Sequence, residues 1–137
     1  MIKKGARGKM EQQYLLRLPA AGGAERIPVP EGGITGALLC DLLQTDVTER
    51  MRVPVMPDAL ADSAKVLCYF LDARGGDKGL PANTPGTCFY HTGCPILGDL
   101  LLCFCDQAGA AVSGFSEAQI SLLTDWLHAQ FPAYFSL

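Results

Sequence analysis

The sequence has few charged residues and no long apolar run. Only 18% of its 137 residues are charged, whereas 49% are hydrophobic, a balance that fits one globular domain with a sizeable core. No apolar run approaches the roughly 20 residues needed to span a bilayer, and the basic start is not followed by the apolar segment of a signal peptide. We therefore expect a soluble, cytoplasmic protein that does not interact with membranes.

Several catalytic motifs are also absent. Neither Gly-x-x-x-x-Gly-Lys-Ser/Thr nor Gly-x-Gly-x-x-Gly occurs, so a phosphate-cradling loop is not indicated. Two-histidine phosphoesterases need two His-x-Ser/Thr motifs, but His91 is followed by Thr92-Gly93 and His128 by Ala129-Gln130. No complete catalytic set remains. Solvation accounts for the carboxylates near the predicted strand ends and turns, which are Asp72, Asp77, Asp99 and Asp106.

The first nine residues differ in composition from the rest of the chain. Residues 1–9 hold four positive side chains, and Met10 then opens a patterned segment. This contrast predicts either a disordered tail or a mis-assigned start, followed by a single α+β domain over residues 10–137. Without those four charges the net charge of −3 becomes −7. An acidic domain repels phosphate backbones, so we do not expect nucleic acid as a partner.

Short apolar runs predict a mainly antiparallel sheet. Residues 66–71 and 100–105 are rich in β-formers, and both alternating faces of the second run are apolar, as in a strand covered on two sides. We place these two strands at the centre. Residues 14–18 and 26–29 flank Ala-Ala-Gly-Gly, a hairpin signal. Residues 51–55 contain Pro54, which lacks a ladder donor and favours an edge strand or a strand end.

Two helices are expected to pack against this sheet. Ser116 and Gln119 form a capping-box pattern before a helix over 117–131, in which Trp126 is predicted to be largely buried. A second helix over 34–44 has apolar residues at helical spacing, namely Ile34, Ala37, Leu38, Cys40 and Leu42. If both helices cover one face, apolar surface is left on the other. That surplus predicts a symmetric homodimer.

The stretch from Asp72 to Asp99 is the most informative part of the chain. It sets a turn around Gly75-Gly76, a Gly-Leu-Pro-x-Asn segment and a Cys/His cluster between the two apolar strands. Loops held by rigid strands often carry function, so the loop over 79–94 is our candidate ligand or partner surface. Its candidate binding residues are Leu80, Asn83, Tyr90 and His91. Asn83 has an alternative role, which is to bond neighbouring backbone and hold the loop shape.

Six cysteines raise the alternatives of a zinc site and a thiol enzyme. Cys88, His91, Cys94 and Cys103 would supply enough soft ligands for a tetrahedral zinc, with Cys103 and Cys105 facing the same side of a strand. Cys88 or Cys94 with His91 could instead form a nucleophile–base pair. A Cys-x-x-Cys pair is absent, and the surrounding apolar runs explain Cys40, Cys68 and Cys103 as buried hydrophobes. We expect reduced thiols and no cofactor.

The order of short motifs between about residues 34 and 126 resembles the uncharacterised domain-of-unknown-function family 3846 of phages and mobile elements of bacteria. The resemblance covers roughly two thirds of the chain. Its carrying motifs are Leu42-Leu43-Gln44, Asp72 with the following glycines, Gly79-Leu80-Pro81-x-Asn83, Ile96-x-Gly98-Asp99 and Phe115-Ser116-x-x-Gln119. The chain departs from the family pattern where Thr45-Asp46-Val47 replaces a Gly-Gly turn. The family supplies no established catalytic residues.

Two functional hypotheses follow. The first is a non-catalytic accessory protein of a phage or mobile element, including a counter-defence factor that binds a host protein or sequesters a small signalling molecule. The resemblance, the acidic charge and the missing catalytic set favour it. The second is a metal-dependent or thiol enzyme that uses Cys88, His91 and Cys94.

Overall fold

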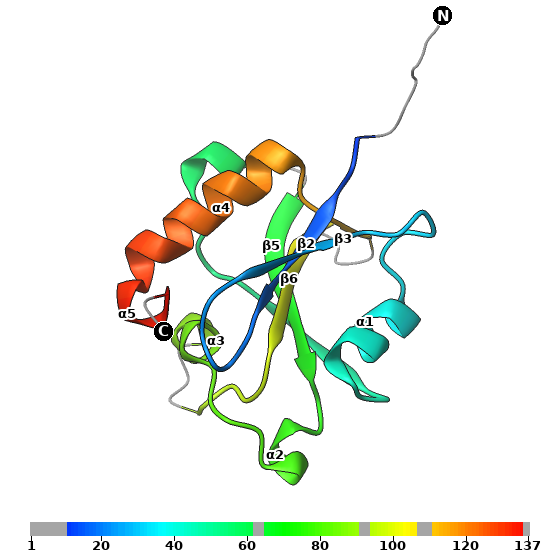
Figure 1. Ribbon diagram of the computed structural model, residues 1–137, viewed down its shortest axis with the longest axis vertical. Coiled ribbons are helices and arrows are strands. Elements are labelled where there is room, and N and C mark those ends of the chain that lie inside the picture. Colours follow the sequence, from blue (N-terminus) through cyan, green and yellow to red (C-terminus); the bar gives the residue numbers. More distant parts are fainter. Residues whose placement is uncertain (1–10, 62–64, 91–93, 107–110, 136–137) are drawn as a thin grey trace, which may run out of the picture.

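The computed structural model describes residues 11–61, 65–90, 94–106 and 111–135 (Figure 1). Its centre is a six-stranded sheet with the order β3-β2-β6-β5-β4, in which all neighbouring strands are antiparallel and β7 pairs with β6. The strands are β2 (Tyr14–Leu18), β3 (Glu25–Pro28), β4 (Thr48–Arg52), β5 (Lys65–Asp72), β6 (Leu100–Asp106) and β7 (Val112–Ser113). The expected α+β fold with a mainly antiparallel sheet is confirmed.

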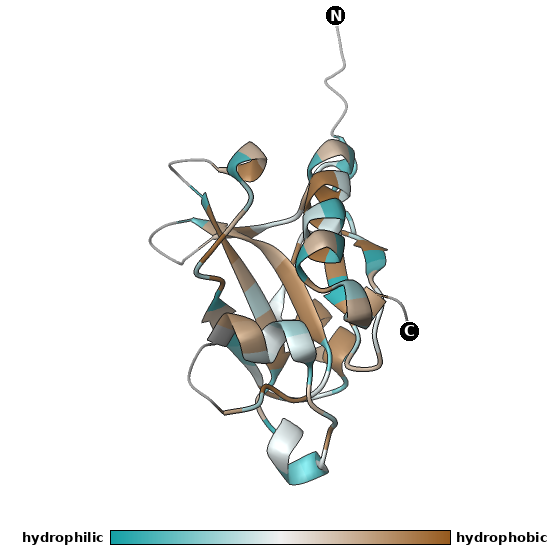
Figure 2. Cartoon of the chain, turned by 90° about the vertical axis from the view of Figure 1, so that its left-hand side faces the viewer, coloured by the Kyte–Doolittle hydropathy of each residue, from teal (hydrophilic) through white to brown (hydrophobic). Residues whose placement is uncertain are grey.

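Alternation along the strands divides the core into two parts. On β6, Leu100, Leu102 and Phe104 enter one cluster, whereas Leu101 and Cys103 enter the other. Both sets are buried, so β6 is covered on two faces, as its sequence predicts. Its place between β2 and β5 puts it at the centre of the sheet. Figure 2 shows the apolar colour gathered on these interior strands.

The helix α4 (Glu117–Gln130) covers the first face of the sheet, and we call that cluster the α4-side core. Ser116 and Gln119 form the predicted capping box, in which each side chain bonds the other residue's backbone N–H. Trp126 is only half-buried, because it lies at the rim of the core and stacks on Phe89 of α3 (Thr84–Tyr90) at 6.4 Å. A short α5 (Pro132–Phe135) follows, and its Tyr134 closes the core.

The helix α1 (Gly36–Leu43) covers the opposite face, and we call its cluster the α1-side core. Leu39 is the buried residue of this helix, whereas Ala37, expected on the apolar face, is exposed. Because α1 and α4 lie on opposite sides of the sheet (Figure 1), the expectation that both helices cover one face is wrong. The apolar surplus that led us to expect a homodimer is thereby reduced, and the dimer stays a prediction.

Several loops contain regular structure that the sequence did not reveal. The segment over 72–78 holds α2 (Gly75–Lys78), the segment over 79–94 holds α3, and the segment over 106–114 holds β7. A 3₁₀ turn, η1 (Asp58–Leu60), lies between β4 and β5. β4 is an edge strand, as predicted, but it starts at Thr48 and ends before Pro54. No helix within the described ranges is long and apolar enough to cross a membrane.

Candidate functional site

A cleft opens at the end of the sheet where β2 and β5 finish and β6 begins. It lies on the α1 side and has a volume of about 300 Å³. We call it the α1 cleft, and it is lined by Arg17, Leu42, Leu43, Gln44, Asp72, Leu80, Pro81, Gly98 and Asp99. Polar and apolar side chains from five separate segments therefore converge on one hollow, as in small-molecule sites.

The carboxyl end of α1 forms one wall of the cleft. The helix ends at Gln44, whose φ of 54° is left-handed, a conformation that glycine adopts most easily. Two cationic side chains donate hydrogen bonds to the carbonyls at this end of the helix. Arg17 Nη2 donates to Leu42 O at 2.7 Å, and Lys78 Nζ donates to Gln44 O at 2.8 Å. Positive charge at this end of a helix is favourable because the carbonyls there are unpaired and negative.

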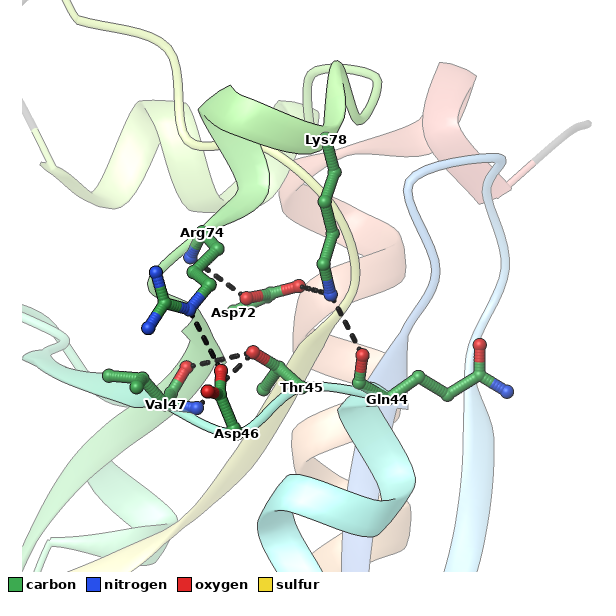
Figure 3. Close-up of polar contacts among 7 residues, drawn as sticks. All are labelled: Gln44, Thr45, Asp46, Val47, Asp72, Arg74 and Lys78. Atoms are coloured by element: carbon green, nitrogen blue, oxygen red, sulfur yellow. Dashed lines mark hydrogen bonds and ion pairs between the residues drawn. The ribbon is translucent and has the colours of Figure 1, made fainter.

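A buried carboxylate joins this wall to α2. Asp72 Oδ2 lies 2.6 Å from Lys78 Nζ, and Asp72 Oδ1 accepts a 2.8 Å bond from the Arg74 N–H (Figure 3). The Asp72 side chain is 3% exposed. Burial alone would raise its pKa, but the hydrogen bonds from Lys78, Thr45 and Arg74 outweigh burial, so the pKa of Asp72 lies below its usual range. Our expectation that solvation explains Asp72 is wrong.

A second ion pair lies outside this clamp. Arg74 Nε approaches Asp46 Oδ1 at 2.8 Å, and both side chains are more than half exposed. The hydrogen bond from Arg74 lowers the pKa of Asp46. Figure 3 shows that the two pairs together tie α2 and the end of β5 to the segment after α1. This segment is Thr45-Asp46-Val47.

The Arg17 guanidinium has one N–H donor without a hydrogen-bond acceptor among the described residues. Its Nη1 lies 3.4 Å from Glu25 Oε1, its Nη2 is bonded to Leu42, and its Nε is buried with no partner among the described residues. The side chain is 21% exposed. A buried donor without an acceptor costs about 1–3 kcal/mol, so native proteins rarely keep one without a reason.

The opposite wall of the cleft is built by Leu80 and the Gly98-Asp99 turn. Gly98 has a φ of 86°, a left-handed conformation that favours glycine, and a Cβ on it would lie 2.8 Å from Leu80 Cδ1, so the end of the Leu80 side chain would have to shift. Asp99 is half-buried and its Oδ1 accepts a 3.0 Å bond from the Ala20 N–H. Among the described residues, the Ala20 N–H is the hydrogen-bond donor that the Asp99 carboxylate has.

Asn83 belongs to the framework behind this wall rather than to its surface. It is fully buried, and its Nδ2 donates to Leu18 O at 2.9 Å and to Gly98 O at 3.0 Å. Its Oδ1 accepts the Gly86 N–H at 3.1 Å, which caps the start of α3. The alternative role, holding backbone, therefore describes Asn83, and we remove it from the candidate binding residues.

Leu80 is the remaining predicted site residue whose side chain the structure describes, and it lines the cleft. Tyr90 ends α3, its side chain is outside the described part of the structure, and His91 lies outside the described residues altogether.

Three of the four proposed zinc ligands lie within the described residues, and these three occupy two environments. Cys88 and Cys94 are exposed, whereas Cys103 is fully buried in the α1-side core, on the other face of the sheet from the core that α3 joins through Phe89. Cys103 therefore cannot complete that ligand set, and this part of the zinc hypothesis is corrected. Within the described ranges, no three Cys, His, Asp or Glu side chains form a metal-binding group.

The buried thiols form a cluster of their own on the α1 side. Cys68 and Cys103 are direct cross-strand partners with their Sγ atoms 3.7 Å apart, and Cys105 faces the same side, as predicted. The contact with Cys103, together with burial, raises the pKa of Cys68, and burial raises the pKa of Cys105 to about 12. Protonated thiols are poor nucleophiles, so this cluster is packing rather than chemistry. Cys40, expected to be buried, is half-buried.

Sequence reasoning missed Arg17 and misjudged Asp72, although one signal places both. In β2, Leu15 and Arg17 share the α1 face, and in β5, Phe70 and Asp72 share it. When one face of a strand is apolar and its last residue is charged, that charged residue indicates where the buried layer of side chains ends.

Comparison of the chain with models of protein families, with curated proteins and with solved structures finds no match.

Proposed function

We propose that this protein is a non-catalytic binding protein that holds a small polar molecule in the α1 cleft. The observation that carries the proposal is the α1 cleft itself, which combines about 300 Å³ of space with the Arg17 cation and the Asp99 carboxylate. Its volume is at the lower end of the range of ligand sites, about 300–1,000 Å³. A ligand of this size is a small metabolite or signalling molecule rather than a peptide.

Rigid surroundings support binding in particular. The cleft wall is fixed by the Asp72–Lys78 pair, by the cap on α1 and by the Asn83 hydrogen bonds behind the Gly98 turn. Preorganised walls lower the entropic cost of binding because few side chains must be ordered by the ligand. No described histidine or thiol lines the cleft, and its two acidic residues are engaged in hydrogen bonds.

The resemblance to the phage and mobile-element family gives this binding a biological setting. We propose an accessory protein that sequesters a small signalling molecule, which is one form of counter-defence. Capture of a host protein is the competing outcome, and it would use an outer surface of the molecule rather than a cleft of this size.

The test is to identify what the purified protein carries. Protein isolated from expressing cells is denatured by heat, and the released small molecules are identified by mass spectrometry. A Leu80→Trp variant fills the cleft from its wall, whereas Leu122→Trp adds the same bulk to an exposed position on α4. We expect the wild type and Leu122→Trp to release the same compound and Leu80→Trp to release none of it.

An equal yield from both variants would contradict binding in the cleft, and so would the absence of any compound from the wild type. Cooperative unfolding of Leu80→Trp establishes that the variant is folded. Asp99→Asn is a second variant that changes charge without changing size, and it should also release less compound.

A further inference from the structure

We infer that the ligand of the α1 cleft is a small zwitterion, with a carboxylate that faces Arg17 and a protonated amine that faces Asp99. This inference rests on the proposed function and names the chemical class of its ligand. It follows from how the charges around the cleft are already paired.

The lining contains three ionised side chains, Arg17, Asp72 and Asp99. Asp72 is neutralised from outside the cleft, because Lys78 lies 2.6 Å from its Oδ2 and the Arg74 N–H bonds its Oδ1. Arg17 also pairs with Glu25, but that contact is 3.4 Å long and the Glu25 side chain is 58% exposed, so solvent weakens the pair. Arg17 and Asp99 therefore remain as one positive and one negative group on the two walls. A ligand complementary to both carries one charge of each sign.

The hydrogen-bonding capacity of the walls agrees with this assignment. On the Arg17 wall the unmet group is a donor, because the Nε–H is buried without an acceptor. A carboxylate that draws the guanidinium toward the cleft would satisfy it through the paired contact that arginine favours. On the Asp99 wall the group is an acceptor, and within the described ranges its one hydrogen-bond donor is the Ala20 N–H, which bonds Oδ1. An ammonium group supplies the matching donors.

Electrostatics disfavour a phosphate-rich ligand. A group with two or more negative charges would meet one arginine but also Asp99 and the carbonyls at the end of α1, two of which already accept bonds from Arg17 and Lys78. Each such contact between negative groups is more unfavourable in a partly buried cleft than in water, because the effective dielectric constant there is lower. A single arginine offsets one of these contacts and leaves the others.

The experiment is an NMR titration of the ¹⁵N-labelled protein with matched probes. The twenty amino acids are added singly, each beside its amide, which lacks the carboxylate, and its N-acetyl form, which lacks the amine. Inorganic phosphate is a fourth probe. We expect at least one amino acid to shift the amide signals of residues 43–44, 80 and 98–99. Its amide and N-acetyl forms should each bind about tenfold more weakly, because each loses one charged contact.

Two variants locate the charges. Asp99→Asn keeps an acceptor for the Ala20 N–H but removes the charge, so it should weaken the amino acid about tenfold and leave the N-acetyl form unchanged. Arg17→Gln should do the reverse, weakening the amino acid and leaving its amide form unchanged. Asp125→Asn on the exposed side of α4 is the control, and it should change no affinity.

The outcomes separate this inference from the proposed function. If the N-acetyl form or phosphate binds at the same signals as tightly as the amino acid, the site is an anion site, so the inference fails and the proposed function stands. If only amine-bearing probes without a carboxylate bind there, the inference also fails. If no probe shifts those signals and no compound is released on heating, both fail.

Discussion

The two faces of the sheet are covered in different ways. On one face, the 14-residue α4 buries Ile120, Leu123 and Leu127 beside aromatic side chains from α3 and α5. On the other, the 8-residue α1 buries only Leu39 over a layer that contains three thiols. The long helix buries three residues on its face, whereas the short helix stops early and leaves the α1 cleft at the end of its own face. We therefore expect the α4 face to contribute more to stability, and we propose the α1 face as the place of the ligand.

Replacing one buried leucine on each face by alanine is the most direct test of this difference between the two faces. Leu123→Ala should destabilise the protein by about 3–5 kcal/mol, because a fully buried position leaves a cavity that rigid neighbours cannot fill. Leu39→Ala should cost about 2–3 kcal/mol, because the short helix can move inward. Chemical denaturation measures both. Equal costs would show that the two faces are packed equally well.

Asn83→Ala tests the framework between the faces. Its side chain makes three buried hydrogen bonds, so its loss leaves two carbonyls and one N–H without their partner. We expect a loss of about 2–4 kcal/mol in the free energy of unfolding. Asn83→Asp retains the acceptor for Gly86 but loses both donors. If Asn83→Ala were folded as stably as the wild type, Asn83 would return to the candidate binding residues.

Lowering the pH should weaken the contacts on the α1 side of the sheet before those on the α4 side. The pKa of Asp72 is lowered in the folded protein, so its contribution is present above the unfolded value near about 3.9 and is lost as the pH falls from about 5 through the folded pKa. Asp72→Asn should cost about 1–2 kcal/mol at neutral pH, a value reduced by solvent around the partly exposed Lys78. Unfolding measured from pH 7 to 3 should then show a shallower acid loss than in the wild type.

The control for this pair is Asp46→Asn. Asp46 pairs with Arg74 at the exposed outer end of the same network, and exposed pairs contribute little. Its removal should leave the midpoint of unfolding unchanged at neutral pH. An acid profile of Asp72→Asn identical to that of the wild type would assign the acid sensitivity to another carboxylate.

Thiol labelling sharpens the comparison without a large change in free energy. Cys88 and Cys94 are exposed, whereas Cys68, Cys103 and Cys105 are buried under α1. In the native state, a thiol-specific reagent should modify the first two rapidly and the other three only after unfolding, since all three are buried. In addition, the contact with Cys103 and burial raise the pKa of Cys68, and burial raises the pKa of Cys105. Rapid modification of Cys105 would show that α1 opens readily.

Chelation should have the smallest effect. Because Cys103 lies in the other core, we expect EDTA to leave the melting temperature of the wild type and of Cys88→Ser unchanged. Metal analysis of protein purified without chelator should find no zinc in proportion to the chain. One zinc per chain, lost in Cys88→Ser, would favour the metal-dependent alternative.

Elements with a local signal could be predicted from the sequence. The capping box at Ser116 and the apolar runs of β5 and β6 depend on neighbours within a few residues, and the structure confirms all three. α3 was missed because proline and glycine were taken as loop residues. Yet Asn83 before Thr84-Pro85 is a helix-start pattern, since proline is tolerated in the first turn.

The candidate site was predicted less well because it is assembled from distant segments. Arg17 and Asp99 are 82 positions apart in the sequence. No local sequence pattern indicates that the end of α1 lies beside both residues in the fold. Leu80, predicted as a binding residue from its place in the Gly-Leu-Pro segment, lines the cleft, and its role in binding stays a prediction. Asn83 was misplaced because a polar residue between prolines suggests exposure, whereas the fold satisfies all its polar atoms inside.

The outer edge of β4 has a consequence for self-assembly. A symmetric antiparallel pairing of this strand with a second copy places residues of the same parity opposite each other. If the pairing is centred on Arg50 or on Arg52, that arginine lies opposite the same arginine of the second copy. If it is centred on Met51, Arg50 of each copy lies opposite Arg52 of the other. Like charges directly opposite are unfavourable. At the other edge, Pro28 lacks a donor. The two edges thus oppose sheet-to-sheet aggregation of newly made chains.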